Sequence, residues 1–296
     1  MKPPPFHYYD PNSVSEAIAL LARLENARPL AGGQSLMAML NLRYAFPDHL
    51  IDLNRIEALS GIERDGEQIR IGAMTRQRDI QEDALIREAL PLLVEALDHV
   101  GHRQTRNRGT LGGSLCHLDP AAELVAVAVN LEATVEVAGP QGTRELPMAE
   151  FAVGFMTTAL QADELVVAVK FSPPSGRHGF SFVELARRHG DFATVSVATS
   201  LLYDARGRIS RAAVTLGGVA AVPQRLTEAE ELLTRSLPGA AAFAQAGDTV
   251  QRLQALDDAF VPAWYRQRVA AVMVRRGLSE AHARWSGEPP GLGAMR

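Results

Sequence analysis

Cysteine is the scarcest residue in this chain of 296 residues, which contains one, Cys116. A single cysteine excludes an internal disulfide, an iron–sulfur cluster held by cysteines of this chain and a cysteine-rich zinc site. Nothing in the surrounding sequence indicates a lowered thiol pKa. We therefore interpret Cys116 as a buried, inert thiol.

The sequence also lacks long apolar runs and a large excess of charge of either sign. No segment approaches the roughly 20 apolar residues of a membrane-spanning helix, and the first residues contain no apolar signal-peptide core. The net charge of -4 at pH 7 gives no global basic field for nucleic acid. We expect a cytoplasmic globular protein with no membrane span and no nucleic-acid partner.

Several familiar chemical patterns are absent as well. The chain has neither the dinucleotide-binding Gly-x-Gly-x-x-Gly nor the P-loop Gly-Lys-Ser/Thr. No nucleophile–histidine set and no acid–base pair of carboxylates can be argued from its residues. The spacing of His99, His102 and His117 fits no metal site, and we interpret them as polar loop or helix-end residues. We assign no catalytic residue and no metal ligand.

Three Gly-Gly pairs are present instead, and we interpret one of them, Gly217-Gly218, as a plain turn. The other two lie in segments flanked by Ser or Thr. Residues 31–35 read Ala-Gly-Gly-Gln-Ser, and residues 110–114 read Thr-Leu-Gly-Gly-Ser within a basic, glycine-rich loop that starts at Gly101. Adjacent glycines let the backbone approach a ligand closely, and successive N–H groups can form a concave anion site. The first pair is expected between a strand and a helix N-terminus, which favours an anion. Two such segments suggest a ligand with two adjacent phosphates, held from both sides.

Hydrophobic periodicity predicts mixed helices and strands. Helices are expected at residues 14–24, 35–42, 75–80, 91–100, 120–131, 227–233, 240–246 and 262–274. Strands are expected at 28–31, 49–53, 133–138, 165–171, 180–185, 194–203 and 209–216, with a hairpin over 62–71. Steady strand–helix alternation is missing, which favours an α+β class over a doubly wound sheet. Residues 172–176 break the pattern and mark an expected domain boundary.

A third segment, residues 187–193, reads Arg-Arg-His-Gly-Asp-Phe-Ala and by itself is typical of a hairpin loop. The three segments occur in the same order and at similar separations in the medium, FAD-binding subunits of molybdenum hydroxylases. These include carbon monoxide dehydrogenase and quinoline- or isoquinoline-type oxidoreductases. The resemblance extends from Phe6 to about Arg275, nearly the whole chain.

The resemblance implies a vanillyl-alcohol-oxidase (PCMH) type FAD-binding domain over residues 1–174. That domain would consist of two α+β subdomains, about 1–55 and 56–174. A C-terminal α+β domain of the carbon monoxide dehydrogenase flavoprotein type would follow over 175–285, with FAD between the parts. Residues 286–296 are rich in Gly and Pro and are expected to form a disordered tail.

The resemblance also implies contacts for each part of FAD. One side of the pyrophosphate would meet Arg28, Leu30, Ala31, Gly32, Gly33, Gln34 and Ser35, and the other side Thr110, Leu111, Gly112, Gly113 and Ser114. His117 and Glu123 would face the ribose or adenine end, with Glu123 standing where the family more often has Asp. Val100, Gly101 and Leu160 would pack near the flavin ring. Phe192 stands where carbon monoxide dehydrogenase-type subunits carry Tyr over the isoalloxazine.

The implied function is electron transfer by FAD. The flavin would take single electrons from a two-iron two-sulfur cluster on a small subunit and pass them to an external acceptor. A large subunit would carry the molybdenum cofactor, and the complex would be a dimer of heterotrimers. Two alternatives stay open: a self-contained flavin oxidase, active as this chain alone, and a colourless nucleotide-binding assembly module without redox work. The sequence names neither the substrate nor the acceptor.

Overall fold

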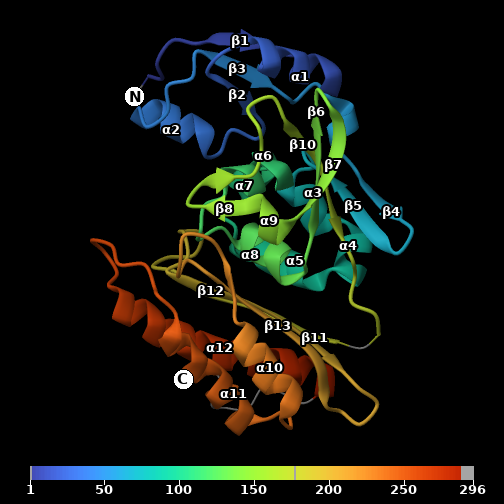
Figure 1. The fold of residues 1–296 in the computed structure, drawn as a ribbon, viewed down its shortest axis with the longest axis vertical. Helices are drawn as coiled ribbons and strands as arrows, with labels where there is room; N and C mark the ends of the chain where they lie inside the picture. Colours follow the sequence, from blue (N-terminus) through green and yellow to red (C-terminus); the bar gives the residue numbers. More distant parts are fainter. Residues whose placement is uncertain (1, 177, 288–296) are drawn as a thin grey trace. The chain divides into compact units, whose positions relative to one another are not determined.

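The computed structural model describes residues 2–176 and 178–287 (Figure 1). Its contacts divide the chain into two units, each built from separate stretches of sequence. The first unit comprises Met1–Asp83, His102–Leu118 and Glu132–Ser172. The second unit comprises Ala84–Gly101, Asp119–Leu131 and Pro173–Arg296. The chain therefore passes between the units more than once.

The N-terminal part of the first unit is a small parallel sheet of order β1-β3-β2. Its strands are β1 (His7–Tyr9), β2 (Ala27–Leu30) and β3 (His49–Asp52), and its helices are α1 (Val14–Arg23) and α2 (Leu36–Leu42). The predicted start of α1 is confirmed, because Ser13 Oγ accepts a hydrogen bond from the Glu16 N–H at 3.2 Å. Buried α1 residues share one apolar core with Ile51 and with Leu165 of the second sheet.

The rest of the first unit surrounds an antiparallel sheet of order β4-β5-β10-β6-β7. Its strands are β4 (Ile62–Asp65), β5 (Gln68–Gly72), β6 (Thr134–Gly139), β7 (Gly142–Pro147) and β10 (Leu165–Phe171). The predicted hairpin is confirmed, with Gly66 at φ +62° in its turn. Short elements complete the unit: η1 (Glu57–Leu59), α3 (Gln77–Glu82), α6 (Arg103–Arg108), α7 (Leu111–His117), α9 (Met148–Phe151), β8 (Ala152–Gly154) and β9 (Thr157–Thr158).

The second unit is built on a sheet of order β11-β12-β13-β14. The strands are β11 (His178–Leu185), β12 (Val195–Tyr203), β13 (Ile209–Gly217) and β14 (Gln224–Arg225). The helices are α4 (Ala84–Ala89), α5 (Pro91–His99), α8 (Glu123–Asn130), α10 (Thr227–Arg235), α11 (Ala240–Asp248) and α12 (Ala263–Ser286), with η2 at Thr249–Arg252. The mixture of one parallel and several antiparallel sheets confirms the α+β class.

Helices cover both faces of the second unit's sheet. Ser200 of β12 donates a hydrogen bond from Oγ to Oδ1 of Asn130 in α8 at 2.7 Å, and Gly277 of α12 lies against the Thr199 side chain. Successive side chains of a strand point to opposite faces. Therefore α8 and α12 lie on opposite faces of β12. Buried Asn130 also donates to the carbonyls of Ala198 and Ala213 at 2.9 and 3.1 Å, which fixes α8 to two strands.

Three expectations from the sequence were wrong in detail. The basic loop starting at Gly101 is largely helical, because α6 is stabilised by tertiary contacts such as Arg106 Nε to Gln81 Oε1 at 3.1 Å. The helix expected from Pro120 begins at Glu123 instead, since Asp119 accepts from the Ala121 N–H in a preceding turn.

The third difference is at the closing helix, which was expected to end at residue 274. Helix α12 continues to Ser286 and ends at Gly287, which has φ +79°. The rest of the expected disordered tail, residues 288–296, lies outside the described residues. In the described part of the chain, no helix has the length and apolar character needed to cross a bilayer.

Candidate functional site

The two Gly-Gly segments lie against one another in the first unit. A Cβ added at Gly32 would lie 2.2 Å from the Arg108 carbonyl oxygen and 2.9 Å from the Gly109 Cα. One added at Gly113 would lie 3.3 Å from the Ala31 Cβ. The backbones can approach this closely only because glycine has no side chain. Tertiary structure therefore joins two segments that are about 80 residues apart.

The first segment presents a row of backbone donors. Within residues 2–176 and 178–287, the N–H groups of Gly32, Gly33, Gln34 and Ser35 donate to no protein acceptor, and the Ser35 hydroxyl also has no protein partner. Gly33 has φ +72°, a conformation that glycine adopts without strain. Backbone N–H groups need partners, and consecutive ones in a turn favour an anion. The segment is therefore a strong candidate for phosphate binding.

The second segment uses its donors within the protein. Leu111 and Gly112 donate their N–H groups to the carbonyls of Thr75 and Ala73 at 3.2 and 2.8 Å, and the Gly113 N–H donates to Thr110 Oγ1 at 3.1 Å. Gly112 packs so tightly that an added Cβ would lie 2.6 Å from the Ala73 Cβ. Its glycines leave room for a ligand to approach the backbone closely. Its Ser114 hydroxyl is available to a ligand, because Ser114 Oγ has no protein partner in the described structure.

Four more of the predicted residues flank these segments in the first unit. Arg28 is exposed on β2, and Leu30 ends that strand with its Cδ1 beside Gly33. His117 is the half-buried last residue of α7, as expected for a helix-end residue. Leu160 follows β9, the strand that contacts α7. The structure thus gathers the predicted pyrophosphate residues and places these four on adjoining elements.

The other predicted residues belong to the second unit. Val100 caps α5, and Gly101 follows it with φ +48°. Glu123 opens α8 and is 6% exposed. Phe192 lies in the loop between β11 and β12 and is 62% exposed, so its ring is available for stacking. The segment 187–193 is a hairpin loop, as its sequence predicts.

Two carboxyl groups of the second unit have strongly raised pKa values. Burial raises the pKa of Glu123 to about 7, with a smaller contribution from the charge of Asp119. Burial also raises the pKa of Glu184 to about 8, and the charge of Glu123 adds to this. One Glu184 carboxyl oxygen is buried without a hydrogen-bond partner. Glu184 was not predicted from the sequence, in which its signal was a carboxylate within the apolar run of β11.

Cysteine and histidine behave as structural residues. Cys116 is partly buried rather than fully buried as expected, and desolvation of its thiol raises the pKa to about 12, which agrees with an inert thiol. Burial lowers the pKa of His99, whose ring lies 5.4 Å from that of Phe182. Over the residues that the structure describes, no group of three or more His, Cys, Asp or Glu side chains could hold a metal ion.

Family models match both parts of the chain. The model described as the FAD binding domain in molybdopterin dehydrogenase matches residues 4–174, and the model of the CO dehydrogenase flavoprotein C-terminal domain matches residues 180–281. Among curated relatives, the 6-hydroxypseudooxynicotine dehydrogenase complex subunit alpha of Paenarthrobacter nicotinovorans is 39% identical over 95% of this chain and 96% of its own length. The carbon monoxide dehydrogenase medium chain of Hydrogenophaga pseudoflava is 36% identical over 96% and 99%.

Solved structures give the same result. A carbon monoxide dehydrogenase structure from Hydrogenophaga pseudoflava matches with a TM-score of 0.93 at 36% identity, over 96% of this chain and 100% of that chain. Quinoline 2-oxidoreductase from Pseudomonas putida 86 matches with a TM-score of 0.92 at 32% identity, over all of both chains. The family expected from three short segments is confirmed over almost the full length. The chain belongs to the FAD-binding medium subunits of the molybdenum hydroxylases.

Proposed function

We propose that this chain is the FAD-carrying, electron-transfer subunit of a molybdenum-dependent hydroxylase or dehydrogenase complex. When bound, FAD supplies the redox chemistry, accepting electrons from a two-iron two-sulfur subunit and releasing them to an external acceptor. One observation carries the proposal for this chain's own residues. The first glycine segment offers unpaired N–H groups at the place where the second segment packs against it.

The residues of this site fit a pyrophosphate. Its negative charges need several donors and room for close approach. The N–H groups of residues 32–35 and the hydroxyls of Ser35 and Ser114 are the donors, and Gly32 and Gly113 leave the room. We propose that Arg28, Leu30, Ala31, Thr110, Leu111 and Gly112 complete this contact.

We further propose contacts for the rest of FAD. His117 and Glu123 face the ribose or adenine, and Val100, Gly101 and Leu160 line the flavin ring. The exposed Phe192 ring stacks on the isoalloxazine, where related subunits carry Tyr. Phe keeps the stacking surface and loses the hydroxyl group. The proposed domains are residues 1–174 for FAD binding, with subdomains about 1–55 and 56–174, and 175–285 for the C-terminal domain.

Partner subunits follow from what this chain lacks. One cysteine cannot hold a two-iron two-sulfur cluster, which needs four ligands. We propose a small iron–sulfur subunit, a large molybdenum-cofactor subunit and assembly as a dimer of heterotrimers in the cytoplasm. The relatives' own names, such as medium chain and subunit alpha, support assembly with other subunits.

The visible absorption spectrum of the purified chain tests the proposal, together with identification of the cofactor released on denaturation. Flavin bands and released FAD are expected. A colourless protein that takes up no added FAD would overturn the assignment and favour a nucleotide-binding assembly module. Substrate oxidation by the isolated chain would instead favour a self-contained flavin oxidase. Neither alternative has a specific structural observation in its favour.

A further inference from the structure

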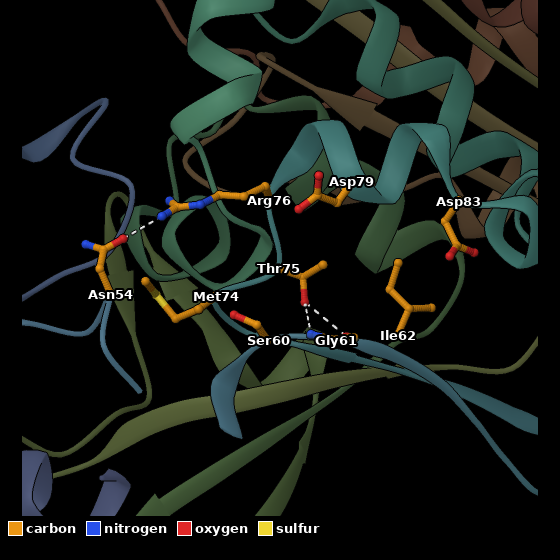
Figure 2. A pocket seen from close by; sticks show the side chains of 9 residues that line it. All are labelled: Asn54, Ser60, Gly61, Ile62, Met74, Thr75, Arg76, Asp79 and Asp83. Atoms are coloured by element: carbon orange, nitrogen blue, oxygen red, sulfur yellow. Dashed lines mark hydrogen bonds between the residues drawn. The ribbon is translucent and has the colours of Figure 1, made fainter. Parts of the chain in front are cut away.

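Arg76 borders a hollow of about 410 Å³ in the first unit (Figure 2). The residue directly precedes α3, and Asn54 lies at the same end of the hollow. Neither residue belongs to a glycine segment, and the family resemblance assigns neither a role. Their hydrogen bonds nevertheless lead directly to both glycine segments.

The Arg76 guanidinium and the Asn54 amide form one bridge. Arg76 Nη2 donates to Asn54 Oδ1 at 2.5 Å, the bond drawn in Figure 2, and Nη1 donates to the Arg108 carbonyl oxygen at 2.5 Å. Asn54 Nδ2 in turn donates to the carbonyl oxygen of Ala31 at 3.1 Å. The Arg108 carbonyl is the group against which Gly32 packs. The bridge therefore connects the Ala31 carbonyl of the first segment with the Arg108 carbonyl, two residues before the second segment.

The bridge is anchored at both ends. The Asn54 N–H and side-chain amide both donate to Asp52 Oδ1, and Asp52 Oδ2 accepts from the Tyr8 hydroxyl at 2.6 Å. This bond is the main reason why the pKa of Tyr8 is raised to about 12. At the other end, the Arg76 backbone forms a β-bridge with Thr110, the residue that caps α7. Arg76 thus contacts the second segment through its main chain at Thr110, and its side chain contacts Arg108, two residues before that segment.

The charge of Arg76 is not balanced by an ion pair. In the described part of the chain, neither Arg76 nor Arg108 lies within salt-bridge distance of a carboxylate. Burial and the neighbouring charge of Arg108 lower the pKa of Arg76, while Asp79 and Asp52 oppose this. Arginine keeps its charge in proteins. Two such charges beside a row of free N–H groups favour an anionic ligand over an empty site.

We infer that Arg76, acting through Asn54 and the Arg108 carbonyl, is a positioning residue that sets the spacing of the two glycine segments for the pyrophosphate. The inference rests on the proposed function. Arginine suits the task because its planar fork can donate to two acceptors in different directions at once. A lysine carries its three donors on one nitrogen, so it would not reproduce the separate contacts of Nη1 and Nη2 and would leave the bridge incomplete.

The test is a titration of the full-length apo chain with FAD, followed by flavin fluorescence, and with ADP by calorimetry. Arg76→Ala is expected to weaken binding of both by about 10- to 100-fold, the range for a lost hydrogen bond to a charged group. Arg76→Lys should recover part of the loss. Arg78→Ala is the matched control, since Arg78 lies in the first turn of α3, two residues after Arg76, and pairs with Glu82 at the surface. It should bind both ligands like the wild type.

A double-mutant cycle separates positioning from general destabilisation. If Arg76 and Asn54 act as one bridge, the combined Arg76→Ala, Asn54→Ala variant loses little more affinity than Arg76→Ala alone. Independent, multiplying losses would overturn the inference. So would FAD affinity within twofold of wild type in both Arg76→Ala and Asn54→Ala. Asn54→Ala and Arg76→Lys keep the test valid if Arg76→Ala does not fold. Failure of the wild-type chain to bind FAD would refute the proposed function itself, a distinct result.

Discussion

The two candidate segments share a Gly-Gly pair and a nearby serine in sequence, but the two pairs differ in structure. Gly32 and Gly33 lie in a turn after β2 whose N–H groups have no protein acceptor in the described structure. Gly112 and Gly113 lie inside α7, with their N–H groups bonded to Ala73 and Thr110. The first pair supplies donors, and the second supplies space. A shared sequence pattern can therefore serve two physical roles within one site.

The difference arises from what surrounds each pair. The N-terminus of α7 packs on the turn that follows β5, so the carbonyls of Ala73 and Thr75 take up its first donors. In the described structure, no carbonyl accepts from the N–H groups of residues 32–35. Gly32 instead packs its Cα side against the backbone of Arg108 and Gly109. We expect substitutions in the two pairs to fail for different reasons.

The largest effect is expected for Gly32→Ala. The new methyl group would lie 2.2 Å from the Arg108 carbonyl oxygen, a backbone atom that cannot turn aside. We expect FAD affinity to fall by more than about 100-fold, because the two segments must separate. Flavin content per purified chain measures this. Gly154→Ala is the control, since a Cβ added at Gly154 would lie 3.9 Å from its nearest contact, the Thr157 Cβ. Normal flavin content in Gly32→Ala would show that the segments need not touch.

Gly113→Val should have a smaller effect. Its Cβ would meet Thr110 Oγ1 at 2.7 Å, an atom that rotation of the Thr110 side chain can move, and the Ala31 Cβ at 3.3 Å, a contact that a small shift relieves. About a 10-fold loss of FAD affinity is expected, with some loss of the α7 cap. FAD content and acceptor-dependent turnover of the assembled complex are the measurements. If both stayed intact, the phosphate site would be assigned wrongly.

Two hydroxyl deletions compare the pairs directly. Ser35→Ala and Ser114→Ala each remove a hydroxyl that has no protein partner in the described structure, so the urea midpoint of the apo chain should not change. Each should lower FAD affinity by about 3- to 10-fold, the range for one hydrogen bond. If only Ser35→Ala weakened binding, the second segment would contribute space alone. Unchanged affinity in both would exclude the hydroxyls as ligands.

The smallest effect concerns pH, and it tests the buried carboxyl group of Glu184 in the second unit. The pKa of Glu184 is about 8 in the folded chain and has the ordinary value of 4.5 in the unfolded chain. The folded chain therefore binds the Glu184 proton more tightly. This stabilises the fold at low pH, and the stabilisation is lost as pH rises from about 4.5 to about 8. Glu184→Gln should show a flatter decline of unfolding free energy over that range. Parallel curves for the two proteins would contradict the raised pKa.

Local patterns predicted the elements with strong local signals. Ser13 and Glu16 fixed the start of α1, and Asp65-Gly66 fixed the turn between β4 and β5. The pattern failed for α6, whose residues Arg103–Arg108 have no apolar face, because contacts with α3 decide its conformation. It also failed at Asp119, where a turn competes with the expected helix cap.

The residues of the site also fall into those that the sequence predicted and those that it did not. The glycine segments were visible in the sequence, because each combines a Gly-Gly pair with nearby hydroxyl residues and because their order matches that of the family. The bridge of Arg76 and Asn54 was not visible, since one arginine and one asparagine in separate segments carry no local signal. Glu184 had a weak local signal, a carboxylate within the apolar run of β11, but its raised pKa depends on burial, which the strand sequence alone does not specify.

The sequence by itself determined the class of fold, the family and the residues that carry the glycine segments, because these depend on residue order and on short-range conformational preference. Tertiary structure alone decided that the two segments meet, and that the first keeps its donors while the second uses them. It also decided that Arg76 bridges the two segments. Hydrogen-bond partners and burial are properties of the folded chain, because they depend on residues that lie far apart in the sequence.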